Sequence, residues 1–298
     1  MEKRVFGKTG MNVSVLGFGG AEIGFEGAST ATVKELLSAA LDAGLNVIDT
    51  AECYMDSEVL IGEAVASRRK DFYLFTKCGH KYTYTEEGWT APDIAESLER
   101  SLKRLQTDYV DLLQLHSCNK AILQKGEVIE ALQKAKEEGK VRFIGYSGDN
   151  EDALYAIKTG AFDVLQTSCS IADQESIEKL IPLAHEKGMG VIAKRPIANA
   201  AWRSTSRPQN IYIQPYWERL RDLQYDFING DAEKAGETAL RFTLSVPNVH
   251  TMIVGTARPT RWIENAKVVG KGNLEQSQYD AIRAQWKKVA RKDWVGQV

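Results

Sequence analysis

Four polar side chains stand at or just beyond the ends of separate apolar runs in this chain of 298 residues. Asp49 follows one run and Tyr54 comes five positions later, while Lys77 and His116 follow two further runs. Buried parallel strands read as short apolar runs, and active sites of parallel barrels lie at the carboxyl ends of the strands. A carboxylate, a phenol, an amine and an imidazole at one rim can hold and transfer a proton, so they predict an enzyme.

The elements that would position these residues alternate along the whole chain. Amphipathic stretches of helical length lie at residues 31–43, 95–105, 128–138 and 177–187, and Gly follows three of them as a stop signal. Eight strand–helix units in roughly 250 residues predict an α/β fold, a (β/α)8 TIM barrel. The alternative is a doubly wound open sheet, but no G-x-G-x-x-G follows the first strand. The expected strands are residues 15–18, 47–48, 72–76, 110–115, 141–146, 162–165, 190–193 and 251–254.

Three segments exceed this repeat. Residues 4–15 predict an N-terminal β-hairpin with Gly10 in its turn. Residues 195–231 form a long, aromatic-rich connection, which is usually functional in a compact domain. Residues 274–291 predict an extra C-terminal helix packed on the outside of the barrel, followed by a short tail. We expect one domain over residues 1–298.

Composition excludes several classes of function. The formal net charge is −2, from 38 basic and 40 acidic side chains, so no long-range field attracts nucleic acid or an anionic membrane. The sequence contains no run of 18 apolar residues, so it predicts no membrane span. Residues 1–7 lead into a turn and not into the apolar stretch of a signal peptide. We therefore expect a cytoplasmic protein that acts on a small molecule as a monomer or weak homo-oligomer.

The cysteines and histidines do not predict a metal site. The four cysteines contain no CxxC pair, and the four histidines have no neighbouring carboxylate at ligand spacing, which disfavours a metal-dependent isomerase. Packing near the rim is the simpler interpretation of the cysteines. A redox-sensitive rim is the alternative, motivated by Cys53 and Met55 on either side of Tyr54.

Several segments together resemble the signature segments of the aldo-keto reductase family. They are residues 46–54, 58–62, 76–77 and 113–116, together with the opening hairpin within residues 6–19. The resemblance extends from residue 4 to residue 270, and the four catalytic segments occur in order at matching spacing. It implies that Tyr54 protonates a carbonyl oxygen as hydride reaches the carbon.

The resemblance also implies roles for the other three residues. Lys77 would favour the phenolate of Tyr54, because a nearby cation stabilises that charged form. Asp49 would hold Lys77 charged and in place. His116 would donate or accept a hydrogen bond at the substrate oxygen.

Hydride must come from a cofactor, because no side chain supplies one. Residues 253–265 resemble the family segment that holds the adenosine end of a nicotinamide cofactor, and their arginines favour NADP(H) over NAD(H). Gly255 replaces a common lysine, and Gly148 replaces the asparagine of a Ser–Asn pair. The expected cofactor contacts are Gly20, Ala21, Asp49, Ser147, Gln166, Arg195, Gly255, Thr256, Arg258, Arg261, Glu264 and Asn265.

Aromatic side chains surround the expected substrate pocket. Trp89 follows Lys77, together with Tyr82 and Tyr84, and Trp202 lies in the long connection. We expect Trp89 and Trp202 to bind substrate with Tyr54 and His116.

The resemblance implies an NADP(H)-dependent oxidoreductase that interconverts an aldehyde or ketone and its alcohol. Aryl aldehydes, aliphatic aldehydes and aldoses remain open as substrates. The alternative is a regulatory or redox-sensing barrel subunit that binds NADP(H) with little turnover.

Overall fold

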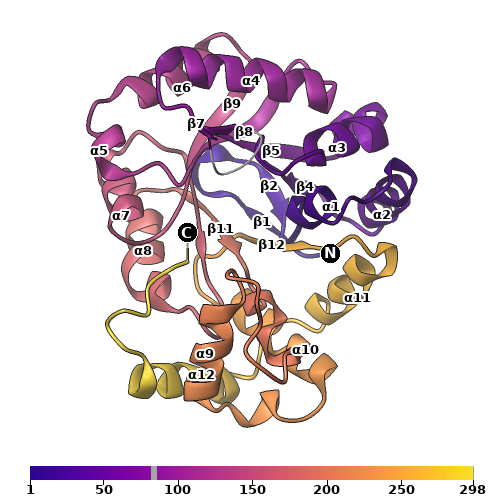
Figure 1. Cartoon of the computed structure of the whole chain (residues 1–298), viewed down its shortest axis with the longest axis vertical. Helices are drawn as coiled ribbons and strands as arrows, with labels where there is room; N and C mark the ends of the chain where they lie inside the picture. The colour runs from indigo at the N-terminus through magenta and orange to yellow at the C-terminus, as the bar shows by residue number, and fades with distance from the viewer. Residues whose placement is uncertain (82–85, 298) are drawn as a thin grey trace.

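The computed structural model describes residues 1–81 and 86–297, so Tyr82 and Tyr84 lie outside the described residues. Eight parallel strands close a barrel in chain order, which confirms the predicted (β/α)8 fold (Figure 1). The last strand pairs with the first, through Val254 and Phe18. The strands are β3 (Leu16–Gly19), β4 (Val47–Asp49), β5 (Tyr73–Cys78), β8 (Val110–His116), β9 (Val141–Ser147), β10 (Val164–Ser168), β11 (Gly190–Lys194) and β12 (Thr251–Gly255).

Helices surround the barrel, and local signals fix where they begin. In α4, Thr90 and Asp93 form a reciprocal capping box and Pro92 lies in the first turn. The helices are α1 (Ala21–Phe25), α2 (Thr30–Asp42), α3 (Ser57–Val65), α4 (Ala91–Leu105), α5 (Lys120–Leu123), α6 (Glu127–Glu137), α7 (Asn150–Thr159), α8 (Glu175–Glu186), α9 (Gln214–Leu223), α10 (Ala232–Leu244), α11 (Pro259–Val269) and α12 (Gln276–Val289).

The N-terminal hairpin closes one end of the barrel. Its strands β1 (Lys3–Val5) and β2 (Asn12–Ser14) pair antiparallel, and Gly10 adopts the positive φ of 70° that the turn requires. Phe6 stacks on Phe75 at 5.9 Å between ring centroids. The hairpin therefore fills the amino end of the barrel and leaves the site to the carboxyl ends. The buried cluster here is Phe6, Met11, Val13, Val47, Phe75, Leu112, Val164 and Ile192.

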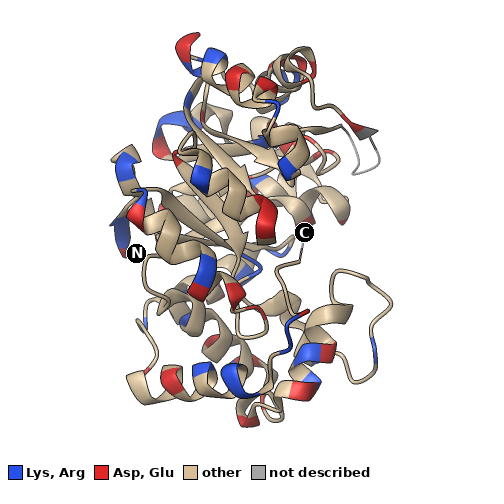
Figure 2. Cartoon of the chain, turned by 90° about the vertical axis from the view of Figure 1, so that its left-hand side faces the viewer, with Lys and Arg blue, Asp and Glu red and all other residues tan. Residues whose placement is uncertain are grey.

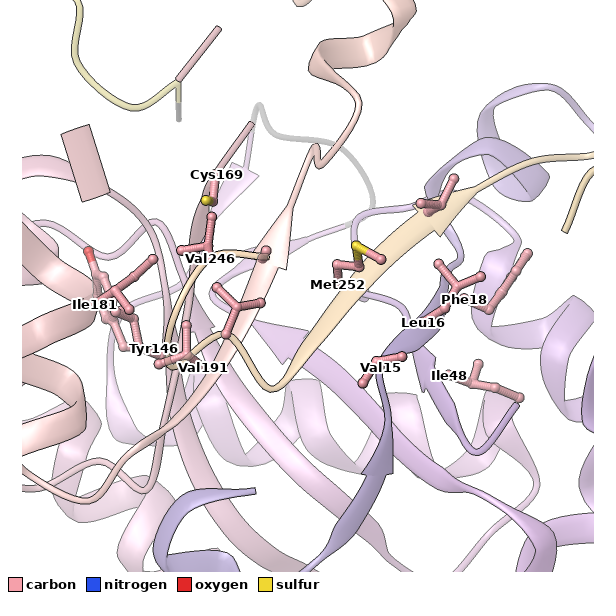
Figure 3. Packing of buried hydrophobic residues seen from close by; sticks show 14 of the residues in the cluster. Val15, Leu16, Phe18, Ile48, Tyr146, Cys169, Ile181, Val191, Val246 and Met252 are labelled. Carbon is pink, nitrogen blue, oxygen red and sulfur yellow. The ribbon is translucent and has the colours of Figure 1, made fainter. Parts of the chain in front are cut away.

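The larger core lies between the barrel wall and the helices. Figure 3 shows Leu16 and Phe18 of β3 near Met252 of β12 and Ile48 of β4. On β4, Ile48 packs in this core while its neighbour Val47 packs in the cluster around the hairpin, so the wall strands have apolar residues on both faces. This two-sided burial explains why the strands read as continuous apolar runs.

The long connection contains more structure than the sequence predicted. It holds 3-10 turns η3 (Ala198–Arg203) and η4 (Asp226–Ile228) on either side of α9. The predicted C-terminal helix is α12, and it packs against α9 at the lower end of the molecule (Figure 1). Arg283 of α12 also bonds Gln174 and Glu178, which ties the helix to α8 on the outside of the barrel.

The C-terminal tail lies against the rim of the barrel. The carbonyl oxygen of Gln297 accepts hydrogen bonds from Ser168, Lys194 and Arg195, all at the carboxyl ends of β10 and β11. The tail therefore covers the β10–β11 side of this rim.

Charges of both signs are interspersed over the elements seen in Figure 2, in line with the near-balanced composition. Among the helices of the described residues, none has the length and apolar character needed to cross a membrane.

Candidate active site

Lys77 and Asp49 form a buried ion pair at the ends of adjacent strands β5 and β4. Lys77 Nζ lies 2.5 Å from Asp49 Oδ1 and donates a second bond to the carbonyl oxygen of Thr50 at 2.8 Å. The side chains are 0% and 1% exposed. The ammonium group is thus fixed by two oxygens, with Asp49 balancing its charge.

Tyr54 lies on the segment between β4 and α3, with its ring next to the ammonium group of Lys77. Lys77 Nζ is 4.9 Å from the centroid of its ring, and the His116 ring meets it edge-on at 5.7 Å between centroids. The structure therefore brings together Asp49, Tyr54, Lys77 and His116, as the strand-end positions predicted. Their catalytic roles stay a prediction.

The backbone around Tyr54 is packed closely. A Cβ atom on Gly24 of α1 would lie 2.0 Å from the Tyr54 carbonyl oxygen. Gly20 donates its N–H to the carbonyl oxygen of Asp49 at 2.7 Å and accepts a bond from Ser57 Oγ at 2.7 Å. Ala21 then begins α1. Two glycines therefore let α1 approach the acid–base residues.

Asp49 has two further partners, one of which the sequence reasoning missed. Gln166 Nε2 donates to Asp49 Oδ2 at 2.9 Å, and Gln114 Nε2 donates to the same oxygen at 3.1 Å. Ser147 Oγ in turn donates to Gln166 Oε1 at 3.1 Å. Gln114 is two residues before His116 on β8. Side chains two residues apart on a strand point to the same face, so the position of His116 would have identified Gln114 as a site residue.

His116 is held as a neutral imidazole. Burial lowers its pKa well below the ordinary histidine range, and the positive charges of Lys77, Lys194 and Arg195 lower it further. Cys53 Sγ lies 3.4 Å from His116 Nδ1. At neutral pH His116 therefore carries no positive charge and is available for hydrogen bonding only.

Five rings form a continuous row across this site, which we call the ring row: Phe25, Tyr54, His116, His80 and Trp89. Successive centroids are 5.8, 5.7, 5.6 and 5.4 Å apart. Phe25 is 55% exposed at one end, and Trp89 is half-buried at the other. Trp89 was predicted as a substrate contact, whereas Phe25 was missed because it lies in a short helix with no motif.

Trp202 does not join the ring row. Its indole N–H donates to the carbonyl oxygen of Ala232 at 3.4 Å, and its ring lies against Gly236 of α10. These contacts hold the indole against α10, and the substrate role of Trp202 stays a prediction.

The segment expected to hold the adenosine end begins at the end of β12. The Thr256 hydroxyl accepts the N–H of Arg258 at 3.0 Å, and Pro259 begins α11. Arg258 is exposed, while Glu264 and Asn265 lie on the second turn of α11. Two arginines and the positive end of a helix can hold a dinucleotide phosphate.

Arg261 is shared between two carboxylates, one on its own helix α11 and one on the neighbouring helix α10. Its Nη1 lies 3.1 Å from Glu233 and 3.0 Å from Glu264. A phosphate at this point would compete with Glu233 of α10 for the guanidinium group. Trp262, fully buried, anchors the helix to the barrel.

Gly148 and Gly255 each lie beside a side chain that limits their space. A Cβ atom on Gly148 would lie 2.7 Å from the Tyr146 ring, whose hydroxyl donates to the Cys118 carbonyl at 2.6 Å. A Cβ atom on Gly255 would lie inside the Glu22 carboxylate. A side chain at position 148 would therefore meet the ring of Tyr146, whereas one at position 255 would require the flexible Glu22 side chain to move.

Arg195 lies just after β11, beside Lys194. Its backbone has a φ of 56°, and its guanidinium group bonds the Gln297 carbonyl at 2.7 Å. Lys194 pairs with buried Asp149 at 2.8 Å. The tail thus contacts Arg195, one of the expected cofactor contacts.

The cysteines are buried and reduced. Burial raises the pKa of Cys118 and of Cys169 to about 12, and that of Cys78 well above the ordinary thiol range. A raised pKa leaves little thiolate, so these three are poor targets for oxidation. Across the described residues, no cluster of three or more histidine, cysteine or acidic side chains could hold a metal.

A closed parallel barrel with acid–base residues at its strand ends is typical of barrel enzymes. The model of the Aldo/keto reductase family matches residues 15–287, so the chain belongs to this family of oxidoreductases.

Similar proteins cover nearly the whole chain. L-galactose dehydrogenase of Arabidopsis thaliana is 32% identical, over 90% of this chain and 88% of its own. A putative voltage-gated potassium channel subunit beta of Schizosaccharomyces pombe is 28% identical, over 89% and 87%. The holo form of aldo-keto reductase AKR11C1 from Bacillus halodurans superposes with a TM-score of 0.84 at 27% identity, covering 99% of each chain.

Proposed function

We propose that this protein is an NADP(H)-dependent reductase that interconverts a carbonyl compound and its alcohol. The observation that carries the proposal is the placement of Tyr54 between the buried Lys77–Asp49 pair and neutral His116. An acid, a cation to ease its proton loss and a hydrogen-bonding imidazole suit carbonyl reduction.

Each residue has one part in the reaction. Tyr54 donates its hydroxyl proton to the substrate oxygen during reduction and takes it back during oxidation. Lys77 favours the phenolate that proton transfer leaves, because a cation near the ring stabilises negative charge. Asp49, held by two glutamine amides, keeps Lys77 in place. When bound, the nicotinamide supplies the hydride that no side chain can provide.

NADP(H) is preferred over NAD(H) in this proposal. Arg258 and Arg261, with Thr256 at the start of α11, suit the extra phosphate, while Glu264 and Asn265 face the adenine. Gly20, Ala21, Ser147 and Arg195 hold the rest of the cofactor. Gln166 and Ser147 bind the carboxamide without the asparagine of the family, since Gly148 stands there.

The ring row suits a carbonyl substrate with a flat or apolar face. Phe25 and Trp89 flank the acid–base pair, and aromatic faces bind flat apolar groups well. Aryl and aliphatic aldehydes fit this row, and one similar protein is named as a dehydrogenase of the sugar L-galactose. All three substrate classes therefore belong in the test panel.

A regulatory barrel that binds NADP(H) with little turnover is the second candidate. The similarity to a protein named as a potassium channel beta subunit favours it. The two candidates differ in turnover and share cofactor binding.

The test is a titration with NADPH by fluorescence, followed by aryl aldehydes, aliphatic aldehydes and aldoses at the nicotinamide absorbance. We expect NADPH to bind, an aldehyde to turn over, and Tyr54→Phe to lose turnover while still binding NADPH. Tyr155→Phe, on α7, is the matched control for loss of a hydroxyl group. Binding without turnover on the whole panel would favour the regulatory candidate. Failure to bind NADPH or NADH would refute both candidates.

A further inference from the structure

Glu22 of α1 lies at the mouth of the barrel, with its carboxylate against the end of β12. A Cβ atom on Gly255 would lie inside this carboxylate, so the carboxylate rests directly on the Gly255 backbone. Glu22 is half-buried, because α1 packs against both β12 and α3. Among residues 1–81 and 86–297, no side chain forms an ion pair or a hydrogen bond with it. The site therefore contains an acidic group that no cation balances.

The surroundings of Glu22 disfavour its charged form. Burial raises the pKa of its carboxyl group above the ordinary range, its own backbone N–H opposes this rise, and the negative charge of Glu26 adds to it. Of the elements packed against α1, β12 has no ionisable side chain, and α3 contributes Glu58 and Glu63 but no cation. Tyr54, whose ring contacts α1, adds no positive charge. A further negative group placed here would thus meet a carboxylate without a counter-ion.

The end of β12 is where the proposed dinucleotide would lie. Gly255 is an expected cofactor contact, and two more, Gly20 and Ala21, immediately precede Glu22. Gly255 is also paired with Gly19 of β3, so two glycines face each other at this edge of the barrel. Glycine lets a ligand approach the backbone closely. Glu22 therefore stands among the expected contacts, although no motif pointed to it.

A carboxylate and a phosphate repel each other at close range, whereas a carboxyl group that holds a proton can donate a hydrogen bond to a phosphate oxygen. Rotation of the Glu22 side chain changes this only within the reach of that side chain. The reason is that α1 itself is held in place, since Gly24 packs tightly against the Tyr54 carbonyl oxygen. The charge of Glu22 thus remains near the end of β12.

We propose that Glu22 opposes the phosphates of the dinucleotide at the end of β12, so that the cofactor binds most tightly when this carboxyl group holds a proton. The inference rests on the proposed function, because it requires a dinucleotide at this end of the barrel. Binding takes the proton up from solvent, and ionised Glu22 favours release of the cofactor. A carboxylate that only faces solvent would leave binding unaffected, and one that accepts a ribose hydroxyl would strengthen it.

The experiment measures the dissociation constants of NADPH and NADH by fluorescence from about pH 6 to about pH 9. Glu22→Gln keeps the size of the side chain but cannot ionise, and Glu22→Ala removes the same charge without adding an amide. Glu26→Gln is the matched control, because it removes an exposed carboxylate from the same helix. The 2′-phosphate of NADPH titrates near pH ~6, but it does so with every variant, so ratios between variants cancel its effect.

We expect Glu22→Gln and Glu22→Ala to bind the dinucleotide about tenfold more tightly than the original protein at about pH 9. A nearby phosphate raises the pKa of the Glu22 carboxyl group further. The affinity of the original protein relative to Glu22→Gln should therefore fall as the pH rises, and the ratio should approach one as the pH falls. Glu26→Gln should keep the pH dependence of the original protein.

Three results would overturn the inference while leaving the proposed function in place. Parallel curves for the original protein and Glu22→Gln would show that the charge does not act on the cofactor. Weaker binding by Glu22→Gln would make Glu22 a hydrogen-bond acceptor for the cofactor. Tighter binding by Glu22→Gln alone, without Glu22→Ala, would assign the effect to the new amide. If neither the original protein nor Glu22→Gln binds NADPH or NADH, the proposed function fails and the inference fails with it.

Discussion

Replacing Lys77 with methionine should destabilise the fold as well as abolish turnover. Methionine keeps an unbranched apolar stem but leaves the buried Asp49 carboxylate without its cation. At the observed 2.5 Å, the direct attraction is about 7 kcal/mol with an effective dielectric constant of about 20. Desolvation offsets part of this, and breaking a buried pair costs about 3–5 kcal/mol. We expect Lys77→Met to lower the free energy of unfolding by that amount.

Asp49→Asn alone should cost a similar amount, because it leaves the ammonium group unpaired. The double variant removes both charges and keeps an amide oxygen for Gln114 and Gln166. It should therefore lose several kcal/mol less than the sum of the two single changes, while its kcat/KM stays at least about 100-fold below that of the original protein.

Urea unfolding of the four proteins in this cycle, with turnover measured at saturating NADPH, gives both quantities. Lys179→Met, which breaks an exposed pair on α8, is the control and should change the free energy of unfolding by no more than about 0.5 kcal/mol. A cost below about 1 kcal/mol for Lys77→Met, or additive single changes, would refute the role assigned to the buried pair.

Three further predictions follow from the surroundings of the site. Gly24→Ala places a Cβ atom 2.0 Å from the Tyr54 carbonyl oxygen. The free energy of unfolding should therefore fall by about 1–3 kcal/mol, and kcat/KM should also fall. The control Gly230→Ala, in open space, should change neither quantity. Burial raises the pKa of Asp173 to about 7, so its contribution to stability is full below about pH 4 and is lost as the pH rises to about 7. Asp173→Asn should flatten this slope in urea unfolding from pH 4 to 8, and parallel curves would contradict the assignment. Phe25→Ala should lower kcat/KM for an aryl aldehyde about fivefold and leave kcat/KM for a short aliphatic aldehyde nearly unchanged. Equal losses for the two aldehydes would show that Phe25 does not select the substrate.

The sequence predicted most of the fold because its signals are local. Two-sided burial makes each barrel strand a short apolar run, and a polar residue such as His116 marks where the run ends. Glycines such as Gly139 mark helix ends, since the backbone there adopts a positive φ of 74°. The long connection was less readable, because α9 has little apolar sequence of its own and is stabilised by packing against α12.

By itself, the sequence determined the barrel, the hairpin, and which four residues stand at the strand ends. Only the tertiary structure decided their partners. Asp49 meets Gln166 across 117 positions of sequence, Cys53 meets His116 across 63, and the tail carbonyl of Gln297 reaches Arg195 across 102. Strand propensity and apolar spacing are properties of neighbouring residues, whereas these contacts exist only once the barrel closes and brings the strand ends to one rim.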